Sequence, residues 1–204
     1  MKNKLYIILS LSFVLLNACK KDDDESTDPN VKTLEIEIYT NLDATATGSQ
    51  GQAGGHYTLF SFKTGDVVAI SDSASTKWDI GFRSTSIIVN GGTSGPGNAG
   101  VVIKSAVFDD VREADASGYA QDNGAVYAIP AGSGNGWYNY DATTHIISPI
   151  AGKVFVVRTA EDKYAKFEII SYYKDAPAQP DANSVSRYYT FRYVYQSNGT
   201  PKIY

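Results

Sequence analysis

Few side chains in this sequence have a nitrogen or sulfur atom of the kind that commonly binds a metal ion. The chain has two histidines, His56 and His145, one cysteine, Cys19, and one methionine, Met1. A structural zinc ion normally needs four nitrogen or sulfur ligands, so we expect no zinc site. No Gly-x-Ser-x-Gly motif marks a nucleophilic serine. No motif supports a carboxylate pair for glycoside hydrolysis either, so an enzyme is the least favoured class of function.

A glycine-rich stretch, NGGTSGPGNAG from Asn90 to Gly100, contains a match to the pattern G-x-G-x-x-G. In dinucleotide-binding proteins these glycines turn a strand into a helix whose N-terminus holds the pyrophosphate. Here the loop is followed by Val101 to Phe108, which begins with β-branched residues and favours a strand. The loop therefore joins two strands. We expect a wide connection with an exposed backbone and no nucleotide site.

The composition indicates a single all-β domain. Among 204 residues there are 15 tyrosines, which suit half-buried strands, and 18 glycines, which suit turns. The net charge is −4, and no basic stripe is present, so we expect no nucleic-acid partner.

Alternation of apolar and polar residues predicts mainly antiparallel strands and hairpins. Trp78, Ile80 and Phe82 are expected to share one strand face, and Tyr189, Phe191, Tyr193 and Tyr195 another. The second stripe favours core packing over an exposed surface for planar rings or sugars. The expected strands cover residues 34–38, 57–62, 67–70, 78–83, 153–159, 164–173 and 187–195.

The N-terminus is typical of a secreted lipoprotein. Two lysines precede an apolar run from Leu5 to Leu16, which is too short to span a bilayer. The following Leu16-Asn17-Ala18-Cys19 resembles a bacterial lipobox, which implies cleavage before Cys19 and lipid on its sulfur. The alternative is an ordinary signal peptide with an incidental cysteine. The lipobox is favoured because a lone cysteine has no partner for an intramolecular disulfide. Residues 1–18 are thus predicted to be a signal peptide.

Residues 19–32 are predicted to be an acidic tether, and residues 33–204 the β domain. The tether begins Cys19-Lys20-Lys21-Asp22-Asp23-Asp24-Glu25. Such a charge run is often only a solvated linker. It also resembles the export signal that sends Bacteroidetes lipoproteins to the outer face of the outer membrane. The aspartates lack the alternating spacing of an EF-hand loop, so calcium binding is not expected.

Several stretches, in order, resemble the HmuY-like lipoproteins of Bacteroidetes. They are FSFKTGDVV from Phe60, WDIGFR from Trp78, the Asn90 to Gly100 loop, KVFVVR from Lys153 and AKFEI from Ala165. The resemblance implies one all-β domain on an outer-membrane lipid anchor. It also implies a non-enzymatic protein that captures haem for uptake, with a TonB-dependent transporter as partner. In this family, pairs of histidine or methionine side chains hold the haem.

The family's ligand pairs are not retained here residue by residue. Met1 would be lost with the signal peptide, and Gly124 to Gly136, where one ligand falls in the family, has neither His nor Met. His145 lies near the family's second ligand and is the best candidate for an iron ligand; His56 is a weaker one. A tyrosinate is a further candidate. The alternative function is an accessory or structural surface lipoprotein that binds a protein or a glycan without haem.

Overall fold

The computed structural model describes residues 34–47 and 54–204. The predicted signal peptide, Cys19 and the acidic tether lie outside the described residues. In the described part, strands predominate, and the helical elements are two short 3-10 turns, η1 (Ile70–Asp72) and η2 (Phe108–Asp110). None of the described helices has the length and apolar character needed to span a membrane. The all-β prediction is confirmed.

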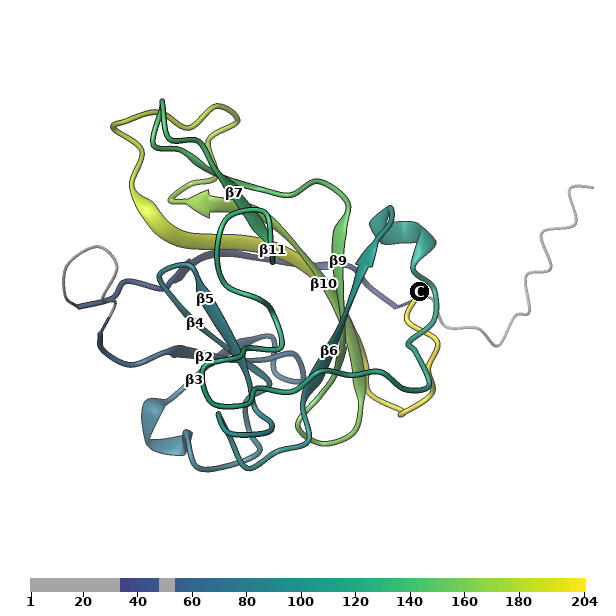
Figure 1. The fold of residues 1–204 in the computed structure, drawn as a ribbon. Coiled ribbons are helices and arrows are strands. Elements are labelled where there is room, and N and C mark those ends of the chain that lie inside the picture. Colours follow the sequence, from purple (N-terminus) through teal and green to yellow (C-terminus); the bar gives the residue numbers. More distant parts are fainter. Residues whose placement is uncertain (1–33, 48–53) are drawn as a thin grey trace, which may run out of the picture. The chain divides into compact units, whose positions relative to one another are not determined.

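The larger sheet has five strands, and each neighbouring pair runs antiparallel (Figure 1). The predicted long hairpin from Lys153 to Tyr173 supplies two adjacent strands. A bulge between Tyr39 and Leu42, where Asn41 has a φ of 57°, shifts the register of the edge strand. The order across the sheet is β1 (Glu37–Asp43), β11 (Ser186–Gln196), β10 (Tyr164–Tyr173), β9 (Lys153–Arg158) and β6 (Gly100–Ser105).

The second sheet has four short antiparallel strands, and a two-stranded hairpin stands apart from it. Gly65 forms the turn between β2 and β3 with a φ of +68°, which glycine adopts without steric cost. The four-stranded order is β3 (Asp66–Val68), β2 (Thr58–Ser61), β4 (Ile80–Arg83) and β5 (Ser86–Val89); the separate hairpin pairs β7 (Tyr138–Tyr140) with β8 (Ile147–Pro149).

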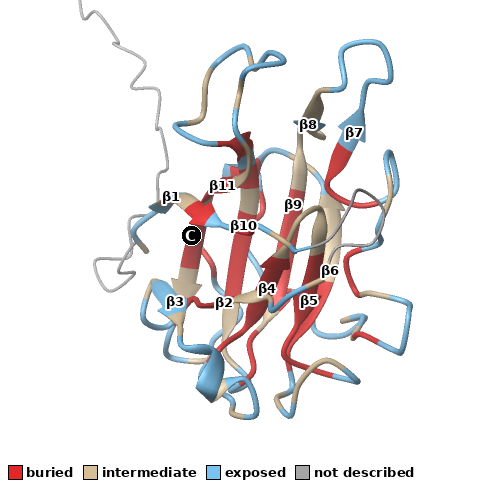
Figure 2. Ribbon diagram, turned by 90° about the vertical axis from the view of Figure 1, so that its left-hand side faces the viewer, coloured by how far each residue is buried: buried red, intermediate tan, exposed pale blue. Residues whose placement is uncertain are grey.

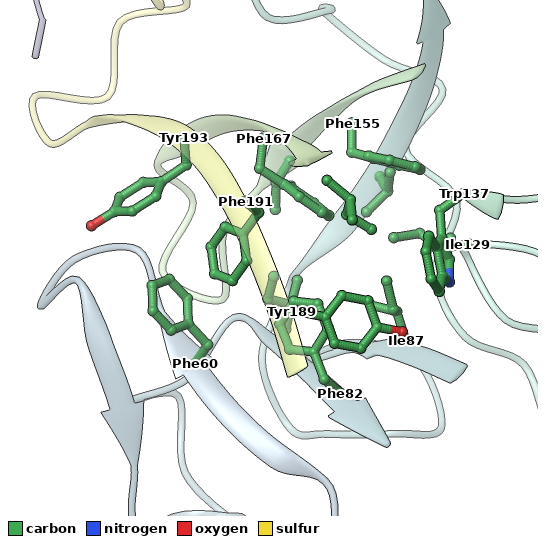
Figure 3. Close-up of a cluster of buried hydrophobic side chains, with 14 of the residues drawn as sticks. Phe60, Phe82, Ile87, Ile129, Trp137, Phe155, Phe167, Tyr189, Phe191 and Tyr193 are labelled. Carbon is green, nitrogen blue, oxygen red and sulfur yellow. The ribbon is translucent and has the colours of Figure 1, made fainter. Parts of the chain in front are cut away.

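Residues of both sheets are buried (Figure 2), and aromatic side chains among them form the main core (Figure 3). Phe191 of β11 makes an edge contact with Phe60 of β2, with ring centroids 5.1 Å apart, and stacks on Phe82 of β4 at 5.5 Å. Burying one such ring contributes about 1.5–3 kcal/mol. The packing prediction for the β11 stripe is confirmed for Tyr189, Phe191 and Tyr193, whereas Tyr195 is only partly buried.

One predicted strand face is wrong. Trp78 does not lie with Ile80 and Phe82 in the main core, because β4 begins only at Ile80. Trp78 instead joins Leu59 and Ile88 in a small cluster, and its indole N–H donates to the carbonyl of Ser73 at 3.0 Å. Leu59 and Ile88 alternate along their strands with residues of the main core, so this cluster covers the outer face of the four-stranded sheet.

The glycine loop joins β5 to β6, as predicted, but its backbone is packed rather than open. The Asn90 side chain accepts a hydrogen bond from Gly97 N at 3.0 Å and donates to the carbonyl of Trp78 at 2.7 Å. A Cβ at Gly95 would lie 2.1 Å from the Asn90 side-chain oxygen, and one at Gly97 2.7 Å from Asn90 O. The glycines therefore permit close approach of chain segments, so the expected open backbone is wrong at Gly95 and Gly97, whereas Thr93, Pro96 and Asn98 are exposed as expected.

Candidate functional site

His145 lies in the exposed loop of the hairpin formed by β7 and β8 (Figure 2). The base of this hairpin is anchored to the domain. Trp137, next to β7, is buried and donates its indole N–H to the carbonyl of Thr85 at 2.9 Å. Ile147 of β8 donates its backbone N–H to the Tyr173 hydroxyl at 2.9 Å. The fold thus holds the imidazole outward on an anchored support.

A compact turn fixes the backbone at His145. The Asp141 carboxylate accepts hydrogen bonds from Thr143 N at 2.7 Å and Thr144 N at 3.2 Å, and these bonds lower the pKa of Asp141. His145 N donates to the carbonyl of Asp141 at 2.8 Å. His145 has a φ of +59°, in the left-handed region. This backbone conformation costs a residue other than glycine about 1 kcal/mol. The position therefore carries a histidine despite a local penalty.

The imidazole of His145 has one nitrogen occupied by a neighbouring side chain. The distance between its Nδ1 and the Tyr140 hydroxyl is 2.5 Å, which is a short hydrogen bond across the hairpin. The two rings have centroids 6.0 Å apart. Occupation of Nδ1 leaves Nε2 as the nitrogen for another partner, and it orients the ring. Tyr140 is itself 44% exposed, so solutes can reach the pair.

His56 lies in a different setting. It is exposed, immediately before β2, next to Gly55 and the partly buried Tyr57. The described residues give the His56 side chain no hydrogen-bond partner that would orient its ring. His56 lines neither of the two depressions described below, and neither does His145. The described residues also contain no group of three or more His, Cys, Asp or Glu placed to hold a metal ion.

A depression of about 470 Å³ lies on the outer face of the four-stranded sheet. We call it the tyrosine–arginine depression. Tyr57 and Tyr127 are partly buried and pack against the cluster of Leu59, Trp78 and Ile88, which holds their rings in place. The lining includes Tyr57, Arg83, Ile88, Thr93, Ser94 and Tyr127.

The guanidinium of Arg83 organises this depression. It stacks on the Tyr57 ring, with Cζ 4.2 Å from the ring centroid, and donates to the Tyr57 hydroxyl at 3.2 Å and to the carbonyl of Gly55 at 2.9 Å. Burial is the main cause that raises the pKa of Tyr57, and the hydrogen bond with Tyr127 raises it further. Tyr57 therefore stays protonated and donates to the Tyr127 hydroxyl at 3.5 Å. This arrangement suits binding of a polar or anionic group.

A second cleft, of about 460 Å³, lies beside the β2–β3 turn. The two lysines that line this cleft form ion pairs: Lys63 contacts Glu161 at 2.8 Å, and Lys77 contacts Asp72 at 3.0 Å. Tyr195, the partly buried end of the β11 stripe, also lines it. The cationic groups of this cleft thus already have anionic partners within the protein.

Asp79 also lines this cleft and links the two sheets. Its carboxylate accepts hydrogen bonds from Phe62 N, at the end of β2, and from Ala160 N, after β9, each at 2.9 Å. The side chain is buried, and burial raises the pKa of Asp79 to about 6. The two N–H bonds lower this pKa, but by less than burial raises it. Since both oxygens are engaged by the backbone, the position is structural rather than catalytic.

Sequence reasoning singled out His145 and His56 but missed Tyr140 and the tyrosine–arginine depression. Tyr140 and His145 are five residues apart, and pairing of Tyr140 with Ile147 across a hairpin brings them together. A predicted turn at Asp141 could have shown this, because aspartate commonly begins such turns. Nothing in the sequence brings Tyr57, Arg83 and Tyr127 together, since they come from three separate segments.

Comparison with protein families gives one result that covers most of the chain. The model of the HmuY protein family matches residues 55–193. This range contains His56, His145 and every side chain named in the tyrosine–arginine depression. No curated protein matches the chain.

Solved structures give more distant similarity. A Bacteroides vulgatus protein designated HmuY-like and haem-binding has 19% identity and a TM-score of 0.46, over 83% of this chain and 94% of its own. A Bacteroides fragilis protein designated a lipoprotein has 15% identity and a TM-score of 0.45, over 78% and 88%. The apo form of a Tannerella forsythia HmuY analogue has 15% identity and a TM-score of 0.44, over 82% and 98%. These TM-scores are below 0.5, so the family assignment rests on the family model alone.

Proposed function

Because the chain belongs to the HmuY family, we propose that it is a non-enzymatic surface lipoprotein that captures haem for uptake. The proposed anchor is lipid on Cys19, which would hold the β domain at the outer membrane through the acidic tether. A TonB-dependent transporter is the proposed recipient of the haem.

The observation that carries the haem proposal is the exposed imidazole of His145. Its Nδ1 is bonded to Tyr140, so Nε2 is free to coordinate iron. Histidines that bind metals commonly bond their other nitrogen to a neighbouring group, which fixes the tautomer and the ring orientation. In the proposed site, Nδ1 carries the proton and donates it to the Tyr140 oxygen. The residues present fit one axial ligand of this kind.

A second axial ligand is not supplied by the usual residue types. The chain has no methionine beyond Met1, and His56 lies before β2 in a separate exposed segment. We therefore propose that His145 would hold the haem iron as its single protein ligand. Haem iron with a single histidine ligand is well known from globins and peroxidases.

The test is a spectrophotometric titration of the purified protein with haemin, which follows the Soret band. His145→Ala should abolish the shift of this band, because it removes the ligand. His56→Ala is the matched control, since it removes the other exposed histidine, and it should leave the shift nearly unchanged. A shift that survives His145→Ala would place the haem on another ligand. No shift in the wild-type protein would favour the accessory lipoprotein without haem.

A further inference from the structure

We propose that the tyrosine–arginine depression binds a saccharide whose ring carries a carboxylate, such as a uronic acid unit. This site is separate from the proposed iron ligand, because His145 and Tyr140 do not line it. The inference therefore does not depend on haem binding. It rests on the charge, the hydroxyl groups and the fixed aromatic rings of the depression.

The charge in the depression selects an anion. Arg83 is the charged residue in its lining, in a chain whose net charge is −4. Its guanidinium donates to Gly55 O and to the Tyr57 hydroxyl, and these two bonds fix its orientation in the lining. A carboxylate in the depression would lie beside the guanidinium, and the planar fork of arginine matches its two oxygens.

The hydroxyl groups select a polar ring. Arg83 donates to Tyr57, and Tyr57 donates to Tyr127, so the hydroxyl proton of Tyr127 is available to a ligand oxygen. Thr93 and Ser94 bring two more hydroxyl groups, and the Thr93 oxygen accepts a hydrogen bond from Gly124 N at 2.9 Å. The lining thus presents four hydroxyl groups, two of which are the polar tips of tyrosine rings that pack on the protein.

The same composition argues against a porphyrin in this depression. Sites for large planar cofactors are mostly apolar, with a few placed polar groups. Among the described residues, Ile88 is the aliphatic side chain of the lining, and the lining includes no histidine to coordinate iron. A hydroxylated ring with one carboxylate matches the polar lining better than a macrocycle does.

The test is calorimetric titration of the purified full-length protein with the trisaccharide of galacturonic acid and with its methyl ester. The ester keeps the rings and removes the charge, so we expect it to bind at least about tenfold more weakly. Arg83→Gln should weaken binding of the acid by about 10- to 100-fold, because hydrogen bonds to charged groups are the stronger ones.

Two further variants keep the test sharp. Arg112→Gln is the matched control, since Arg112 also stacks on a tyrosine, with Cζ 4.3 Å from the Tyr204 ring centroid, but lies outside the depression. It should bind the acid like the wild type. Tyr127→Phe removes one hydroxyl group and keeps the ring, so it should weaken binding about fivefold and tests the site even if Arg83→Gln fails to fold.

Three results would overturn the inference. One is no binding of the acid, or equal binding of acid and ester. Another is unchanged affinity in Tyr127→Phe together with unchanged affinity in a folded Arg83→Gln. The third is displacement of the saccharide by haemin, which would make the depression a haem site.

Discussion

Replacing Asp79 with asparagine should change how stability depends on pH. Burial raises the pKa of this carboxyl group to about 6, whereas its ordinary value is 3.8. Between these values the folded chain keeps the proton, while the unfolded chain has released it. The folded state then binds more protons, so the free energy of unfolding falls as pH rises through this interval.

The size of the effect follows from the size of the shift. A change from 3.8 to about 6 is roughly two pKa units, and each unit corresponds to about 1.4 kcal/mol. Wild-type protein should therefore lose about 2 kcal/mol of stability between pH 4 and pH 7, relative to Asp79→Asn, because at pH 4 the unfolded chain has already released part of this proton. Asparagine does not titrate, so subtraction removes the contributions of all other carboxyl groups.

The assay is urea unfolding of both proteins at several pH values, followed by circular dichroism. We expect the stability difference, wild type minus variant, to fall from pH 4 to about pH 6 and then to level off. A difference that rises with pH would show that the N–H bonds from Phe62 and Ala160 outweigh the cost of burial. A difference that does not depend on pH would refute the reasoning as well.

Three further predictions concern the haem site, the anchor and the glycine loop. Tyr140→Phe should lower haem affinity about tenfold in the Soret titration, because the partner of His145 Nδ1 is lost; unchanged affinity would contradict the proposed role of Tyr140. Cys19→Ala should leave the chain unlipidated and outside the membrane fraction, and retention after a carbonate wash would contradict the lipobox. Calorimetry should detect no binding of NAD or ATP, since the loop joins two strands; micromolar binding lost on replacement of Gly97 would contradict this.

The strands with long alternating patterns could be predicted from the sequence. The hairpin from Lys153 to Tyr173 and the buried face of β11 are examples, because period-2 alternation reports directly which side of a strand is buried. The pattern predicts the wrong face for Trp78, because it does not reveal that β4 begins at Ile80. The glycine loop was expected to be open, since contacts such as the one between Gly97 and Asn90 depend on chain segments meeting in three dimensions.

The candidate sites were less accessible to sequence reasoning. His145 was identified by residue type and resemblance, but its partner Tyr140 depends on the β7–β8 hairpin, whose strands have three residues each and give little periodic signal. The tyrosine–arginine depression combines residues from three segments. The charge of Arg83 indicates a binding site only when the structure shows that its guanidinium lies over the Tyr57 ring. No local pattern encodes such an arrangement.

The most direct test of the central proposal is the haemin titration of the wild-type protein, read at the Soret band and by electron paramagnetic resonance. We expect saturation at one haem per chain and the high-spin ferric signal of a five-coordinate site with a single histidine ligand. A low-spin signal would contradict the proposed coordination, because it would require a second strong ligand beside His145. No Soret shift with excess haemin would contradict haem capture itself.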